Sequence, residues 1–289
     1  MSLPPAAQIA SPRQTYWDWR SAGNFMLGGS GAGVLIYAAT GFGGRLLDLL
    51  GAALIAGGLL GVWSEIGRPL RAMNAFRHGS TSWMSREMFV APLVLAGALT
   101  ATWFDVPWLR WLAAALAVVY IYCQARMLNA GRGIPAWRNP RTVPLLMASG
   151  LAEGTGFGVM AGGLTVSTGA RPWPMAVLAV CVLARVIAFV SYRRALPKVG
   201  APGRALRETT RFGRVLSVLD ALALALALGS ASAGGLLPLA LPAALIAAAS
   251  GWWLKYTLVI RLSYKQPFTV PISVMRGGGA APSGSRHGG

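Results

Sequence analysis

Charged residues are scarce in this sequence, and acidic residues are the scarcest among them. Only 12% of the 289 residues are charged, whereas about a quarter are charged in a typical soluble domain. Hydrophobic residues make up 55% of the chain. Most of them fall in runs of about twenty, the length at which a helix crosses the hydrocarbon core of a bilayer. This composition excludes a soluble enzyme.

Cysteine and histidine are also nearly absent. The two cysteines, Cys123 and Cys181, lie inside apolar runs and form no Cys-x-x-Cys pair, which excludes a disulfide framework and a zinc or iron–sulfur site of that type. His78 lies in a connection and His287 lies near the C-terminus, so no two histidines can face each other to ligate a b-type haem. We therefore expect no haem and no metal ligand in this chain, and any electrons that it handles must come from a partner.

The basic residues outnumber the acidic ones by 26 to 8, and such a surplus is common in nucleic-acid-binding proteins. Here the basic residues lie between the apolar runs, and not along one face or one tail, which argues against a nucleic-acid partner. The opening MSLPPAAQIASP has no basic segment followed by an apolar one. We therefore expect the first span to be a retained helix and not a cleaved signal peptide.

The apolar runs predict an all-α integral membrane protein with eight transmembrane helices in a bundle. Residues 1–21 are expected to form a cytoplasmic N-terminal segment, 22–261 the membrane domain, and 262–289 a cytoplasmic tail with a flexible end. Glycines at four-residue spacing inside several spans indicate close helix packing: Gly29 and Gly33, Gly57 and Gly61, and Gly154, Gly158 and Gly162. The expected spans are 22–42, 46–66, 87–104, 109–128, 143–165, 173–193, 214–232 and 236–259.

Lysine and arginine are distributed unequally between the two sides of these spans. One side holds only Arg45, Arg110 and Arg171, and the other holds the remaining 23. The positive-inside rule places the arginine-rich side, and with it both termini, in the cytoplasm. An even number of spans is required for that arrangement, and eight satisfies the requirement. We expect the protein to lie among the lipids of a bacterial inner (cytoplasmic) membrane.

Three ionisable residues fall inside the expected spans: Glu153, Arg185 and Asp220. An ionisable group at this depth indicates function, because it must face a cavity or find a partner. One interpretation is a structural ion pair of Arg185 with Glu153 or Asp220. The other is a role in handling protons, as in a proton-coupled secondary transporter. The absence of an obvious internal repeat argues against a transporter, but the sequence leaves both interpretations open.

The second connection is the richest in reactive side chains, with the sequence WSEIGRPLRAMNAFRHGSTSWMSRE over residues 63–87. Two carboxylates, a histidine, several arginines and two tryptophans meet there at one membrane surface. A quinone site needs this mixture: donors for the carbonyl oxygens, proton carriers, and apolar walls for the ring and tail. The same residues also fit an interfacial loop, with arginines on lipid phosphate and a tryptophan belt.

Several short motifs carry a resemblance to a known family. The segments EIGRPLRAMN (65–74), SRE (85–87), RMLN (126–129) and IPAW (134–137) resemble the membrane anchor of dimethyl sulfoxide reductase (DmsC-type, within the NrfD-like superfamily). The opening YWDWRSAGNF and the segment GRGIPAW are most similar to a branch labelled as the membrane subunit of phenylacetyl-CoA:acceptor oxidoreductase.

The resemblance implies an anchor for two partners, a ferredoxin-like iron–sulfur subunit and a molybdopterin catalytic subunit. Such an anchor exchanges electrons with a membrane quinone, either ubiquinone or menaquinone, which we expect on the cytoplasmic side. Glu87 matches the family's carboxylate near the quinol site, and Arg126 and Asn129 match its motif after the fourth helix. The family's quinol-site histidine falls at Glu65 in this chain. Either Glu65 takes over the proton-carrying role, or the quinone is bound differently.

The resulting hypothesis is a quinone-reactive membrane subunit that transfers electrons to or from a docked iron–sulfur subunit. Glu65 and Glu87 are the expected proton carriers. The alternatives are a proton-coupled secondary transporter and a purely structural tether. The expected quinone contacts are Arg68, Arg71, His78, Trp83, Arg126 and Asn129.

Overall fold

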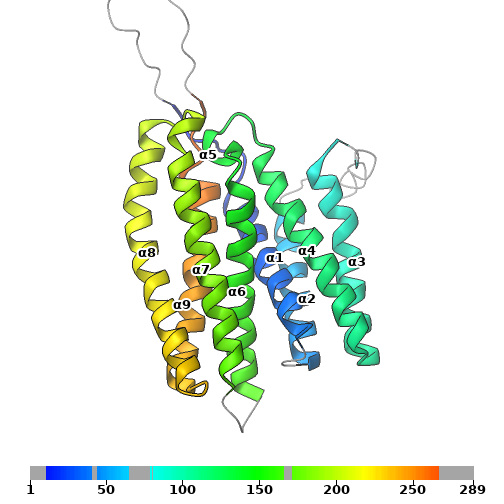
Figure 1. The fold of residues 1–289 in the computed structure, drawn as a ribbon. Helices are drawn as coiled ribbons and strands as arrows, with labels where there is room; N and C mark the ends of the chain where they lie inside the picture. The colour runs from blue at the N-terminus through cyan, green and yellow to red at the C-terminus, as the bar shows by residue number, and fades with distance from the viewer. Residues whose placement is uncertain (1–10, 41–43, 65–78, 80, 166–170, 267–289) are drawn as a thin grey trace, which may run out of the picture.

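The computed structural model of the chain describes residues 11–40, 44–64, 79, 81–165 and 171–266, and these form a bundle of long helices that run side by side (Figure 1). No strand occurs in these ranges, where a single isolated bridge joins Arg13 to Tyr264. The helices are α1 (Trp19–Ala38), α2 (Gly44–Trp63), α3 (Trp83–Phe104), α4 (Pro107–Asn129), the short α5 (Pro135–Arg138), α6 (Thr142–Thr165), α7 (Pro172–Ala195), α8 (Gly203–Ser232) and α9 (Leu237–Tyr256). Two helical turns, η2 (Pro197–Val199) and η3 (Thr257–Arg261), follow α7 and α9.

Seven of these helices are long and apolar enough to cross a membrane: α2, α3, α4, α6, α7, α8, and α9 with its extension to Arg261. The prediction of helices that are long and apolar enough to cross a membrane is therefore confirmed for seven. α1 has the length of a span but not the hydropathy, because it contains Arg20, Asn24, two serines and five glycines. It lies inside the bundle, in contact with α2, α4, α6 and α9, and most of its residues are buried. A helix inside the bundle needs no apolar surface toward lipid, which explains the low hydropathy of α1. That α1 is an eighth span stays a prediction.

Glycines bring the backbones of α1 and α6 into direct contact. A Cβ atom added to Gly154 would collide with the backbone of Gly33, and one added to Gly33 would collide with the carbonyl oxygen of Gly150. Small residues permit this approach where lipid offers no hydrophobic drive for association. The expected packing by glycines is thus confirmed at this contact. It is wrong for Gly61, since a Cβ there would meet nothing within 4 Å.

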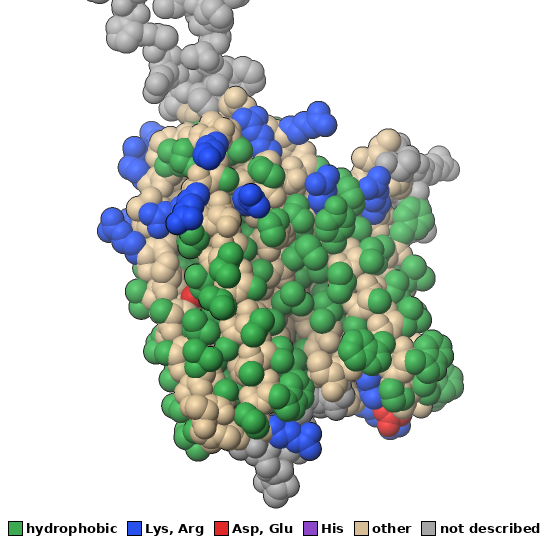
Figure 2. Space-filling model, in the orientation of Figure 1, with side chains coloured by type: hydrophobic (Ala, Val, Ile, Leu, Met, Phe, Trp, Pro, Cys, Tyr) green, Lys and Arg blue, Asp and Glu red, His purple; other side chains and the backbone are tan. Residues whose placement is uncertain are grey.

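Basic side chains gather at one end of the bundle, where α5 and the start of α8 lie (Figure 2). Two cations that the sequence assigned to this side are buried inside the bundle instead: Arg185 and Lys255, with exposed fractions of 0% and 1%. Without these two residues, the arginines and lysines are still distributed unequally between the two ends of the bundle.

The opposite end holds a small ionic cluster. Arg110 donates to Asp48 at 2.9 Å and to Asp105 at 2.6 Å, and Arg45 lies 3.9 Å from Asp105. Asp105 ends α3 in the left-handed conformation, with φ of 53°. The hydrogen bond and the charge of Arg110 lower the pKa of Asp105 below its ordinary value. Two of the three cations on this side are therefore paired with carboxylates.

The segment expected to begin the tail packs against the bundle over the part that the structure describes. Leu262 and Tyr264 are buried. The nitrogen of Gln14 donates to the carbonyl of Ser263, and the nitrogen of Lys265 donates to the carbonyl of Pro12. The two ends of the described chain thus run together beside α5.

Candidate functional site

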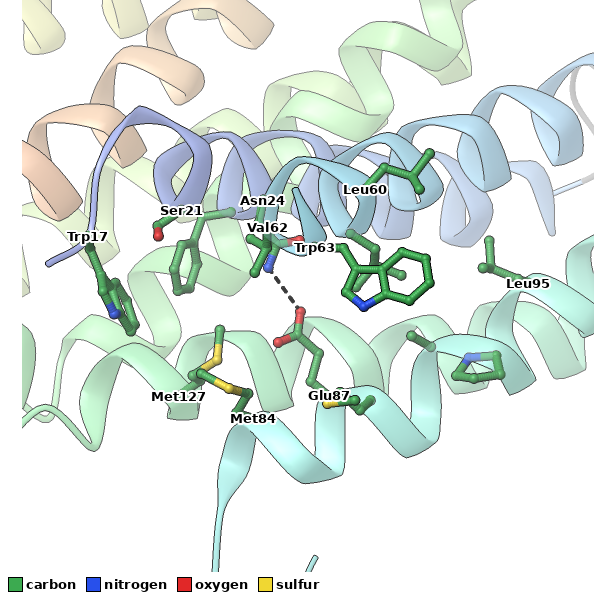
Figure 3. Close-up of a pocket in the computed structure, with 15 residues that line it drawn as sticks. Trp17, Ser21, Asn24, Leu60, Val62, Trp63, Met84, Glu87, Leu95 and Met127 are labelled. Atoms are coloured by element: carbon green, nitrogen blue, oxygen red, sulfur yellow. Dashed lines mark hydrogen bonds between the residues drawn. The ribbon is translucent and has the colours of Figure 1, made fainter. Parts of the chain in front are cut away.

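A cavity of about 450 Å³ lies among α1, α2, α3 and α4, near the arginine-rich end of the bundle (Figure 3). This volume is in the range of small-molecule sites. Its walls are mostly aromatic and apolar, and they include Trp17, Phe25, Trp63, Met84 and Met127. The polar side chains that line it are those of Ser21, Asn24 and Glu87.

The cavity reaches the outer face of the bundle between α2 and α3. Leu60, Trp63 and Met84 line it and are themselves 60%, 52% and 47% exposed. The cavity is therefore accessible from the side of the bundle, past apolar side chains.

Glu87 supplies the carboxylate of the cavity and is 3% exposed. It lies in the second turn of α3, which begins after Ser82, whose hydroxyl accepts a hydrogen bond from the nitrogen of Ser85 at 3.4 Å. The side-chain nitrogens of Asn24 and Gln124 each donate to Glu87 Oε1 at 3.3 Å. Within the part of the chain that the structure describes, no lysine or arginine pairs with Glu87. Neutral donors hold this carboxylate beside an apolar cavity, a position from which it can exchange protons with a bound ligand.

Gln124 organises the polar wall of the cavity from α4. Its Nε2 donates to the backbone carbonyl of Asn24 at 2.9 Å as well as to Glu87, and Tyr120 also contacts Glu87. The Oδ1 atom of Asn24 is buried and accepts no hydrogen bond from any described residue. This atom points toward Gly58 of α2, where an added Cβ atom would lie 3.0 Å from it, so it is not an acceptor in the cavity.

Neither Asn24 nor Gln124 was predicted from the sequence as a site residue, because neither is ionisable. Asn24 lies in the opening YWDWRSAGNF segment that carries part of the resemblance, and Gln124 lies in none of those segments. Both are neutral polar side chains in otherwise apolar segments. A buried amide needs hydrogen-bond partners as a buried charge does. A neutral amide side chain inside an apolar segment was therefore the sequence feature that could have indicated these two residues.

Trp83 and Arg126 lie close to the cavity but not on its lining. The guanidinium groups of Arg86 and Arg126 lie 4.1 Å and 4.9 Å from the ring centroid of Trp83. Tyr122 packs edge-on against the same ring. This stack holds the start of α3 against the end of α4, beside the cavity.

Asn129 lies away from the cavity and stabilises the connection between α4 and α5. Its amide donates to the carbonyls of Trp137 and Asn139 at 3.0 Å and 2.9 Å, which fixes α5 against the end of α4. The other expected site residues, Glu65, Arg68, Arg71 and His78, lie outside the described residues.

A second polar cluster occupies the middle of the bundle. Lys255 donates to Glu153 at 2.7 Å, and Arg185 pairs with Asp220 at 2.5 Å. The sequence offered a pair of Arg185 with either acid, and the structure selects Asp220. The sequence did not predict Lys255 as the partner of Glu153.

Serine hydroxyls and a backbone carbonyl complete these pairs. Ser30 and Ser149 donate to Glu153 at 2.7 Å and 2.8 Å. Arg185 also donates to the carbonyl of Ala247 at 2.6 Å and to the hydroxyl of Ser250 at 2.8 Å. Both ion pairs are thus buried and supported by further hydrogen bonds.

No protein-family model matches the chain. The chain is 31% identical to one of the subunits of the sulfite dehydrogenase of Allochromatium vinosum, in a match that covers 38% of this chain and 39% of that relative. The chain thus spans well under half the length of the curated relative that it matches. It contains helices suited to a membrane and is similar in part to a subunit of an oxidoreductase.

Proposed function

We propose that this chain is the quinone-reactive membrane subunit of an oxidoreductase complex. The observation that carries the proposal is Glu87, a buried carboxylate held by neutral amides in a mostly apolar cavity that opens at the side of the bundle. A quinone is an apolar ring and tail with two carbonyl oxygens, and its reduction takes up two electrons and two protons. The cavity supplies an apolar wall, hydrogen-bonding groups and a proton carrier for that reaction.

The roles of the side chains follow from their positions. Asn24 and Ser21 line the cavity and are the neutral polar groups that hold the oxygens of the ring. Glu87 donates a proton to the quinone or accepts one from the quinol. The tail leaves past Leu60 and Trp63, toward lipid.

The electrons come from partners that dock on the arginine-rich end, which we assign to the cytoplasm by the positive-inside rule. α8 has 30 residues, so it is about 45 Å long, longer than the roughly 30 Å of a hydrocarbon core. Its first turns carry Arg204, Arg207, Arg211 and Arg214 and give that end a basic surface. In this proposal the partners are a ferredoxin-like iron–sulfur subunit and a molybdopterin subunit, α1 is an eighth span, and the membrane is a bacterial inner membrane.

The relative's name suggests sulfite as the first substrate to test for the whole complex. Oxidation of sulfite to sulfate releases two electrons and two protons, which matches the reduction of one quinone. Dimethyl sulfoxide and phenylacetyl-CoA are the substrates to compare with it, because the motifs around Glu65, Glu87, Arg126 and Trp137 resemble anchors of those enzymes.

The test is quinone-coupled turnover of the complex purified from native membranes, with Glu87→Gln as the variant. We expect quinone-coupled turnover to fall at least about a hundredfold, in line with the loss of a general acid–base group. Dye-linked activity of the catalytic subunit should be unchanged. Asp105→Asn, which replaces a carboxylate at the opposite end of the bundle and outside the cavity, is the control. Full quinone-coupled turnover in Glu87→Gln would contradict the proposal.

The two alternatives differ in what purifies with the chain and in what it binds. A structural tether brings iron and molybdenum with it but binds no decylubiquinone. A secondary transporter, for which the buried charges of Glu153 and Asp220 argue, purifies without either metal. Metal analysis and a quinone-binding measurement on one preparation separate the three functions.

A further inference from the structure

The two buried ion pairs and the carboxylate of the cavity belong to one line of polar groups. The line runs from Glu87 on α3, through Gln124 on α4, to Lys255 on α9 and Glu153 on α6. It continues to the Arg185–Asp220 pair between α7 and α8. Each ionisable side chain in it is at most 3% exposed.

Gly29 of α1 forms the junction between Gln124 and Lys255. A Cβ atom added to Gly29 would collide with Lys255 Nζ and lie 3.5 Å from Gln124 Oε1. The ammonium and the amide oxygen therefore face each other across a residue without a side chain. They are at most about two hydrogen-bond lengths apart, a gap that one water can bridge.

Gly251 of α9 forms a similar junction between the two ion pairs. A Cβ atom added there would lie 2.5 Å from Glu153 Oε1 and 2.7 Å from Arg185 Nη1. Ser250 precedes it on the same turn, and its hydroxyl donates to Asp220 at 3.3 Å and accepts from Arg185. Two glycines thus keep the line open at the points where a side chain would interrupt it.

Packing alone does not require this arrangement. Burying ions costs several kcal/mol for each ion, and apolar residues of similar volume are often as stabilising as a buried ion pair. Ionisable residues inside a membrane therefore indicate a pathway or a site. The binding of a quinone beside Glu87 uses neither Lys255 nor Glu153.

We propose that this line carries protons between the cavity and the Glu153–Lys255 pair, an inference that rests on the proposed function. In quinol oxidation the two O–H bonds break, and two electrons leave to the redox centre of the partner subunit. One of the two protons goes to the Glu87 carboxylate. The other leaves the cavity directly.

From Glu87 the proton passes to Lys255 through water in the gap at Gly29. Gln124 holds Glu87 with its Nε2 and orients that water with its Oε1, and the amide itself carries no proton. The Lys255 ammonium gives one of its protons to Glu153 Oε2, 2.7 Å away, and takes up the incoming proton in exchange. The pair then holds one more proton than before, on the Glu153 carboxyl group. Quinone reduction runs the same steps in reverse.

The test uses Gly29→Ala in the purified complex, with decylubiquinol as the donor. The added methyl group fills the gap between Lys255 and Gln124 and removes no ionisable group. Gly23→Ala is the matched control, since it lies on the same helix and its Cβ would meet nothing within 4 Å. We expect Gly29→Ala to slow quinol-coupled turnover about tenfold and to raise the solvent deuterium isotope effect, with decylubiquinol affinity within about twofold of the control.

A double variant, Lys255→Met with Glu153→Gln, tests the acceptor pair without leaving an unpaired buried charge. It should show the same slower turnover and raised isotope effect. If Glu87→Gln abolishes turnover while Gly29→Ala and the double variant match Gly23→Ala, the protons take another route and this inference is wrong, but the proposed function stands. If the unmodified complex binds neither decylubiquinol nor a soluble menaquinol analogue, both proposals are wrong.

Discussion

The ammonium of Lys255 on α9 donates a hydrogen bond of 2.7 Å to the carboxylate of Glu153 on α6, and both side chains are buried in the middle of the bundle. The contact joins residues 102 positions apart in the sequence. Ser30 of α1 donates to the same oxygen and accepts from Trp252 of α9. This arrangement ties α1, α6 and α9 together and leads to a prediction about stability.

Lys255→Met alone should destabilise the protein by about 3–5 kcal/mol, because it leaves Glu153 as a buried charge without its ammonium. Adding Glu153→Gln should restore most of that loss, since a neutral amide needs no counter-ion. The measurement is thermal unfolding in detergent, analysed as a double-mutant cycle. Lys265→Met, in the segment after η3, is the control for the loss of a lysine. Equal losses in the single and double variants would show that the ion pair is not the source of the effect.

The depth of Lys255 illustrates which part of the fold the sequence could predict. The runs of apolar residues locate seven helices, because hydropathy reflects the surface that each helix presents to lipid. Hydropathy does not show which polar residues face inward. Lys255 lies six residues before the end of the α9 extension at Arg261, and a lysine near a span end usually reaches the interface. Its carboxylate partner is on another helix, so only the tertiary structure reveals it.

The candidate site shows the same division between local and tertiary information. Glu87 was predicted from its motif, and the structure places it on a cavity wall. Asn129 belongs to a motif too, but its amide holds the backbone of residues 137 and 139. A sequence motif shows which residues occur together. It does not show whether a given residue contacts a ligand or only holds a turn in place. Gln124 was missed because its role comes from contacts with α1 and α3.

The contact between α1 and α6 leads to a prediction about packing. Gly154→Ala should strongly destabilise the bundle, because the added Cβ would collide with the backbone of Gly33, which cannot rotate away as a side chain can. Gly61→Ala should have little effect or be slightly stabilising, because a Cβ there meets nothing within 4 Å and alanine is the better helix former. The measurement is the thermal midpoint of both variants in the same detergent. A midpoint for Gly154→Ala equal to that of Gly61→Ala would contradict the close contact.

Asp105 leads to a prediction about acid stability at the end opposite the arginine-rich one. Its pKa in the folded protein is below the ordinary value of 3.8, because Arg110 donates to it and attracts its charge. A carboxyl group with a lowered pKa stabilises the fold above its unfolded pKa, and that contribution is lost as the pH falls toward the folded value. Asp105→Asn should therefore remove part of the acid sensitivity below about pH 4. Asparagine also tolerates the left-handed conformation at this position.

The measurement for Asp105 is the thermal midpoint between about pH 3 and pH 7, compared with Asp18→Asn. Asp18 is a helix cap at the arginine-rich end, where it accepts from the nitrogen of Arg20, so its replacement affects the other end of the bundle. An unchanged slope of the midpoint with pH in Asp105→Asn would show that the pair with Arg110 contributes nothing measurable.

Gln124 leads to a prediction about ligand affinity. Gln124→Met keeps the length of the side chain but removes the donor that Glu87 shares with the backbone carbonyl of Asn24. The loss of a hydrogen bond to a charged group costs about 1.5–3 kcal/mol. The carboxylate should then no longer be held in one position beside the cavity. We expect decylubiquinone to bind roughly tenfold to a hundredfold more weakly, measured by titration of the detergent-solubilised protein.

The control for Gln124 is Tyr122→Phe on the same helix, since Tyr122 is exposed and packs against Trp83 outside the cavity lining. The double variant Gln124→Met with Glu87→Gln provides a second check. If Gln124 acts through Glu87, adding its replacement to Glu87→Gln should cost little further affinity, because the two effects are coupled. Losses that simply add would mean that Gln124 contacts the quinone by itself or shapes the cavity, independently of the carboxylate.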